Sequence, residues 1–269
     1  MLNYSLNRII QTKQFLTIMF IMSVITIFDA ILHVMMLNGF SLAKSMWLNT
    51  FMASSLGGMY GHMLTTFLLG LYPIWLLLGA GFSILKDFKT GQSYNVVSRV
   101  GIAKYLSSQF IAAGLAGTIL FAVPLLLNLI VIWLIRLCPL KTFDGQMMLL
   151  IDKSRLPNVD KYHFVWWQLE NPALTFVAYL FVFLISTFVT TMFMVAISLV
   201  FGNFYQILTL VSLGTILLGS QMFDIGKMLQ SFAQLITWQN WLFSWLCLIA
   251  AFVVFNSLIF LWRCHGELA

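Results

Sequence analysis

The sequence predicts an all-α membrane protein with six transmembrane helices, and three observations lead to this class. The 269-residue chain is 61% hydrophobic and has a mean hydropathy of +0.96. Only 8% of its residues are Asp, Glu, Lys or Arg, whereas soluble domains carry about 25%. Its apolar stretches are continuous and lack the alternation that is typical of membrane-spanning β-strands. This composition argues against an intrinsically disordered chain, a secreted disulfide scaffold and a cytosolic enzyme with its own nucleotide domain.

Six apolar segments are predicted to cross the bilayer, which takes about 20 helical residues. They are residues 15–37, 63–85, 106–135, 173–200, 206–223 and 241–262. Asp29 is the only formally charged residue within them. Because a charge in the hydrocarbon core is costly, this partition of charge is typical of helices in lipid. We therefore expect a single six-span membrane domain over residues 1–269, with a long external connection at residues 137–172.

Smaller features predict how these segments pack. Gly114 and Gly117 lack side chains and are expected to let another helix approach closely. Pro73 is expected to bend the second segment, and Pro124 is expected to bend the third. The aromatic residues of the 137–172 connection indicate either a belt at the membrane boundary or a cap that binds a substrate or partner.

The sequence contains no recognisable catalytic or metal-binding motif. There is no H-E-x-x-H, no G-x-S-x-G and no phosphate-binding loop. Cys138, Cys247 and Cys264 are scattered and have no histidine at metal-ligand spacing. We therefore expect no enzyme activity, no metal and no cofactor in this chain. The net charge of +6 is explained by lipid headgroups and membrane topology, so we expect no nucleic-acid partner.

The connection between the second and third segments, residues 86–105, is the most informative stretch. It is basic, with Asp87 as its only acid. Val96, Val97 and Val100 are spaced to share one face of a helix, which predicts a short amphipathic helix. Periodicity alone indicates no more than a basic segment that lies against the membrane surface.

This connection resembles that of the membrane subunits of type 2 ABC transporters, the six-span ABC-2 exporter family. Asp87-x-x-x-Gly91 is followed by Arg99 and then by Lys104, just before the third segment, as in that family. The resemblance implies that Asp87, Gly91, Arg99 and Lys104 belong to a coupling helix that docks on an ATPase subunit. It also places this connection and both termini in the cytoplasm. The basic residues on the two sides of the membrane are equal in number and do not decide the orientation by themselves.

The resemblance also implies an assembly. A six-span chain is half of such a transporter, so it pairs with a second permease chain, identical or related, and with two ABC ATPase subunits that hold ATP and Mg²⁺. The complex is expected in the plasma membrane (the inner membrane of a bacterium), surrounded by membrane lipids. The apolar segments suit an amphipathic or apolar cargo, such as a peptide, a drug or a lipid. Residues 1–14 resemble an amphipathic entry helix, and residues 224–240 are either half-inserted helices or an ordinary surface loop.

Asp29 and His33 support an alternative. They are four residues apart and so share one face of the first segment. An ionisable pair inside the membrane is a candidate for function. The pair either serves helix packing, lines a transport path or carries protons. In the last case the chain is a proton-coupled secondary transporter or channel. A third alternative is an assembly or anchoring subunit without transport of its own.

Overall fold

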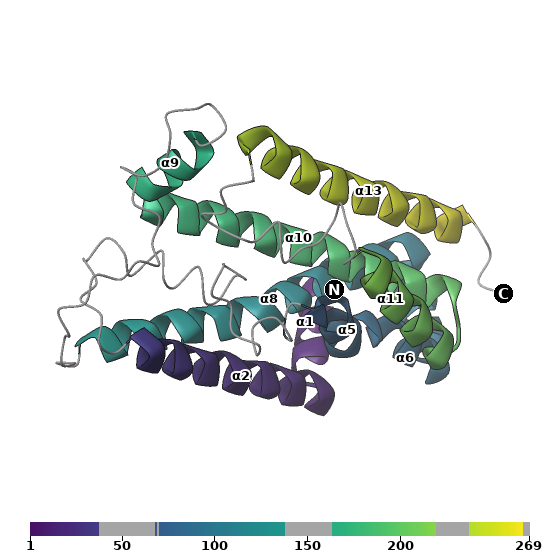
Figure 1. The fold of residues 1–269 in the computed structure, drawn as a ribbon. Coiled ribbons are helices and arrows are strands. Elements are labelled where there is room, and N and C mark those ends of the chain that lie inside the picture. The colour runs from purple at the N-terminus through teal and green to yellow at the C-terminus, as the bar shows by residue number, and fades with distance from the viewer. Residues whose placement is uncertain (38–67, 69, 138–162, 219–236, 266–269) are drawn as a thin grey trace.

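The computed structural model describes residues 1–37, 68, 70–137, 163–218 and 237–265, and all regular structure in these residues is helical (Figure 1). The all-α prediction is therefore confirmed for this part of the chain. Four helices are long and apolar enough to cross a membrane. Their apolar portions are Lys13–Ile31, Ile102–Val131, Val177–Val200 and Trp238–His265.

These four helices correspond to four of the six predicted segments. They are α2 (Lys13–Leu37), α8 (Ile102–Leu137), α10 (Pro172–Val200) and α13 (Trp238–His265). α8 packs along both α2 and α10, and α13 packs on α10, so the four form a bundle (Figure 1). The helix α8 continues through Pro124 without ending there.

The second predicted segment is not a single long helix in the described residues. Its described part contains α5 (Tyr72–Leu76), a π-helical turn η1 (Leu77–Gly81) and the start of α6 (Ser83–Lys89). The fifth segment corresponds to α11 (Phe204–Leu218) as far as it is described, and residues 219–223 lie outside the described residues. The length of the apolar sequence alone did not reveal the interruption of the second segment.

Close packing explains why the second segment contains a π-turn. A Cβ atom added at Gly81 would lie 2.9 Å from the Cβ of Met194 in α10. One added at Gly79 would meet the side chain of Leu120 in α8. The Ser198 hydroxyl donates a hydrogen bond of 3.0 Å to the Gly81 carbonyl, where the helical ladder is irregular. Glycine and this hydroxyl together allow a widened turn at the centre of the bundle.

The predicted close approach at Gly114 and Gly117 is confirmed. A Cβ atom at Gly114 would lie 2.7 Å from the Phe188 ring, and one at Gly117 would lie 2.8 Å from the Thr191 Cβ. Both contacts join α8 to α10. Small residues permit such proximity between helices, which is what holds helices together in lipid.

Three short helices complete the described structure. They are α1 (Leu2–Ile10), α7 (Gln92–Val100) and α9 (His163–Glu170). α1 is amphipathic, with Ile9 buried and Asn3 exposed, and it runs across the direction of α2 (Figure 1). α7 is the short helix predicted within residues 86–105. Residues 138–162 of the long connection, and 224–236 of the stretch predicted to hold half-inserted helices, lie outside the described residues.

Aromatic side chains join α9 to α10 and α13. The ring of Phe164 lies 5.0 Å from that of Trp238, and Trp241 lies 4.9 Å from Tyr179, between ring centroids. Phe164, Tyr179 and Trp241 are buried. These rings pack on one another and therefore form a local core at the end of the bundle where α13 begins.

Candidate functional site

Basic residues gather at one end of the bundle, which we call the basic end. α2 and α8 begin there and α10 and α13 finish there, since the Arg263 guanidinium in α13 donates to the Leu199 carbonyl in α10. The elements at this end carry seven Lys or Arg residues. They are Arg8, Lys13, Lys86, Lys89, Arg99, Lys104 and Arg263. Asp87 is the only acidic residue described at this end.

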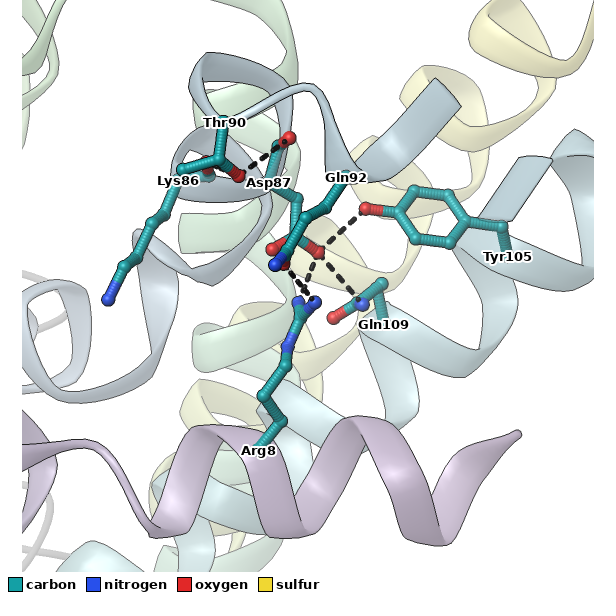
Figure 2. Close-up of polar contacts among 7 residues, drawn as sticks. All are labelled: Arg8, Lys86, Asp87, Thr90, Gln92, Tyr105 and Gln109. Carbon is teal, nitrogen blue, oxygen red and sulfur yellow. Dashed lines mark hydrogen bonds and ion pairs between the residues drawn. The ribbon is translucent and has the colours of Figure 1, made fainter. Parts of the chain in front are cut away.

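Asp87, which is buried, lies at the centre of a polar network (Figure 2). Its Oδ2 accepts hydrogen bonds from the Tyr105 hydroxyl at 2.8 Å and from Gln109 Nε2 at 3.2 Å. The same oxygen forms an ion pair with Arg8 Nη2. Arg8 Nη1 in turn donates to Gln92 Oε1 at 3.2 Å. We call Arg8, Asp87, Gln92, Tyr105 and Gln109 the Asp87 network.

The Asp87 network joins four helices. Its members come from α1, α6, α7 and α8, and Asp87 is only 3% exposed. A carboxylate buried to this extent is costly unless it is paired and hydrogen-bonded, and here it is both. Hydrogen bonds to a charged group are the stronger kind. The network therefore makes the position of α6 and α7 depend on α1 and α8.

Two glycines bound α7. Gly91, which precedes it, has φ +71° and ψ 2°, in the left-handed region. Gly101, which follows it, has φ +81° and ψ 153°, a conformation essentially restricted to glycine. The chain therefore changes direction sharply on both sides of α7, and this is the physical reason for glycine at the fourth position after Asp87.

The outer face of α7 is polar and exposed. Tyr94 is 55% exposed, and Asn95, Ser98 and Arg99 are also exposed. The opposite face packs on the core through Val96, Val97 and Val100, as predicted from their spacing. Lys104 is exposed in the first turn of α8. The helix thus presents hydrogen-bonding groups and a cation outward from the basic end.

The predicted pair Asp29 and His33 is placed only in part. Asp29 is in α2 and is 1% exposed, with a polar neighbourhood one turn earlier, where Asn128 Nδ2 donates to the Thr26 carbonyl at 2.7 Å. His33 belongs to α2, but its side chain lies outside the described residues. The structure therefore places a buried carboxyl group in the bundle without placing its predicted partner.

Of the four predicted coupling residues, Asp87 is buried in the network and Gly91 lies at the turn before α7, whereas Arg99 and Lys104 are exposed on the surface. Sequence reasoning did not find Gln109 or the pairing of Arg8 with Asp87. Tyr105 and Gln109 do leave a signal, because they are polar groups four residues apart and so share one face at the start of α8. Arg8 leaves none, since it is separated from Asp87 by 79 positions.

The basic end offers exposed cations and hydrogen-bonding groups that are connected to the bundle through the Asp87 network. Within the described ranges, no three His, Cys, Asp or Glu residues come together to hold a metal ion. The fold and this site define a class: an α-helical protein with four helices long and apolar enough to span a membrane. No protein-family model, curated protein or solved structure matches the chain.

Proposed function

We propose that this chain is the membrane subunit of an ATP-driven exporter of the type 2 ABC class, and that α7 is where an ATPase subunit acts on it. One observation carries the proposal. The segment from α6 through Gly91 to α7 is anchored inside the bundle by Asp87, while its polar face points outward from the basic end. A docking element needs both properties, an exposed surface and a firm connection to the spans.

The Asp87 network explains how a push on α7 would reach the membrane. Gln92, in the first turn of α7, is hydrogen-bonded to Arg8 of α1, and Asp87 is hydrogen-bonded to Tyr105 and Gln109 of α8. α8 is packed closely on α10 through Gly114 and Gly117. Movement of the ATPase subunits between two states would thus be passed to the bundle as a rigid-body shift.

The proposed assembly has this chain paired with a second permease chain and two ATPase subunits that hold ATP and Mg²⁺. The chain is a multi-pass protein of the plasma membrane, with six spans and both termini in the cytoplasm. The cytoplasmic placement of the basic end rests on the resemblance of residues 86–105 to a coupling segment, because Lys and Arg are equally numerous on the two sides of the membrane. Arg99 and Lys104 are exposed cations for acidic groups on the ATPase. The cargo is an amphipathic or apolar molecule.

Photo-crosslinking tests this proposal in the full chain purified in mild detergent from its own membranes. A photoreactive amino acid at Tyr94 or Ser98 is expected to form a covalent product with an ABC ATPase subunit. The same group at Phe243, an exposed apolar residue of α13, is the matched control and is expected to form none. Crosslinks from α7 only to lipid or to other positions of the same chain would contradict the proposal.

Substitutions separate binding from coupling. Arg99→Glu reverses an exposed charge and is expected to weaken ATPase docking, whereas Gln239→Glu, exposed at the start of α13, is not. Gly91→Pro is expected to abolish the stimulation of ATP turnover by cargo, because proline cannot adopt φ +71°. Normal cargo-stimulated turnover in both the Arg99 and Gly91 variants would remove α7 from the mechanism.

The burial of Asp29 favours a second candidate function, a proton-coupled secondary transporter or channel. A carboxyl group that is 1% exposed in an apolar helix is the kind of group that proton carriers use. In that case Asp29→Asn abolishes transport together with its dependence on pH. Under the exporter proposal the same variant, reconstituted with its ATPase, retains ATP-driven transport.

A further inference from the structure

A cavity of about 470 Å³ opens at the basic end, within the range of volumes that small-molecule sites occupy. It lies beside the Asp87 network, between α1, the η1–α6 segment and the start of α11. Its lining is of two kinds. Apolar side chains come from several elements, with Ile9, Leu78, Phe82 and Phe204 among them, and the polar side consists mainly of Arg8 and of residues on α6.

Arg8 and Asp87, which also line the cavity, form an ion pair with each other, so two cations on α6 supply its remaining charge. Lys86 and Lys89 are three residues apart and so share one face of the helix. Both are exposed, and neither forms an ion pair with any residue that the structure describes. Lys86 extends away from Asp87 (Figure 2). Because the charge of Asp87 is already compensated by Arg8, the positive charge of these two lysines is available to a ligand.

The apolar side of the cavity identifies the rest of the ligand. The rings of Phe82 and Phe204 are stacked with centroids 4.5 Å apart and form part of its wall. α1 is an amphipathic helix that packs on the bundle where α2 begins, a position typical of the membrane–water boundary. A ligand that places an anion on Lys86 and Lys89 and its tail on these rings must be amphipathic.

We infer that this cavity binds the phosphate group of an anionic phospholipid, with Lys86 and Lys89 as the residues that recognise the phosphate. Gln14, whose side chain also lines the cavity, supplies a neutral hydrogen-bond donor. Basic groups at a membrane surface attract anionic lipids in this way. The inference is independent of the proposed exporter function, since it requires neither an ATPase nor transport.

Lipid retention by the full chain tests the inference. The protein is equilibrated in mixed micelles of equal amounts of phosphatidylglycerol and phosphatidylcholine, washed in detergent, and its bound lipid is identified by native mass spectrometry. Phosphatidylglycerol is expected to be retained in preference to phosphatidylcholine. Each lysine near an anionic headgroup contributes about a fivefold preference for the anionic lipid. The preference for phosphatidylglycerol over phosphatidylcholine is therefore expected to fall roughly thirtyfold in the variant K86Q/K89Q.

Lys104→Gln is the matched control, because Lys104 is exposed at the same end but does not line the cavity. Its lipid preference is expected to stay within about twofold of the unmodified chain. Equal loss in Lys104→Gln and in the double variant would overturn the inference, because it would indicate attraction by the general surface charge. Unchanged retention in K86Q/K89Q would overturn it as well.

Glycerol phosphate and inorganic phosphate distinguish a lipid from a free phosphate. Both carry the anion but lack the tails that would cover Phe82 and Phe204. Neither is expected to displace phosphatidylglycerol at millimolar concentration. Displacement by either one that is lost in K86Q/K89Q would assign the cavity to a soluble phosphate compound and overturn the lipid inference.

Discussion

Arg8 and Asp87 are expected to depend on each other for stability, because each compensates the charge of the other in a place with little access to water. The Arg8 side chain is 25% exposed and that of Asp87 is 5% exposed. Three variants test this dependence: Asp87→Asn, Arg8→Gln and the two combined. Asparagine and glutamine keep hydrogen-bonding groups of similar size while removing the charges, so the variants report on charge rather than on volume.

The structure sets the expected magnitudes. Removing one partner of a buried ion pair costs about 3–5 kcal/mol. Arg8→Gln falls at the lower end, about 3 kcal/mol, because Tyr105 and Gln109 still donate to the remaining carboxylate. Asp87→Asn is expected to cost about 2 kcal/mol, since the partly exposed Arg8 can turn to water. The double variant leaves no buried charge and is expected to cost about 2 kcal/mol, less than Arg8→Gln alone.

The assay is reversible unfolding in mixed micelles by titration with a denaturing detergent, followed by tryptophan fluorescence. The expected result is that the double variant has a larger free energy of unfolding than Arg8→Gln alone. The control cycle combines Asp87→Asn with Lys13→Gln, because Lys13 is exposed and forms no ion pair in the described residues. That cycle is expected to be additive within about 0.5 kcal/mol. Additivity in the Arg8–Asp87 cycle too would refute the reasoning.

Two further predictions concern glycines and are read from the same unfolding titration. Gly117→Ala brings a methyl group against Thr191 and is expected to cost about 1–3 kcal/mol. Gly202→Ala, where no atom lies within 4 Å, should change stability by no more than about 0.5 kcal/mol; equal effects of the two would contradict the packing argument. Gly91→Asn should be tolerated, because asparagine accepts a left-handed conformation, whereas Gly101→Asn is expected to cost about 1–3 kcal/mol. A reversed order would show that the backbone angles do not set these costs.

Most of the helical architecture could be predicted from the sequence because lipid imposes a simple requirement. A span must be apolar along its whole length and must satisfy its own backbone, so composition and length suffice to find it. α2, α8, α10 and α13 satisfy this requirement and appear where they were predicted. The close packing at Gly114 and Gly117 could be predicted as well, because a residue without a side chain lets a neighbouring helix approach closely.

The second predicted segment shows where such reasoning fails. Its composition is that of an ordinary span, yet a π-helical turn interrupts it at Leu77–Gly81. Whether a helix stays regular depends on what lies opposite, here Leu120 and Met194 on neighbouring helices. Hydrophobic periodicity contains no information about those neighbours.

Three properties of this protein follow from its sequence alone: it is helical, its long apolar segments suit lipid, and a short amphipathic helix follows Gly91. These properties depend on residues close together in the chain, or on each residue's own preference for water or hydrocarbon. The packing of the helices was needed to show that Arg8 compensates Asp87 and that Lys86 and Lys89 border a cavity shared with α1 and α11. Charge interactions act over a few ångströms in space, and the chain distance between two groups says nothing about that separation until the helices have packed.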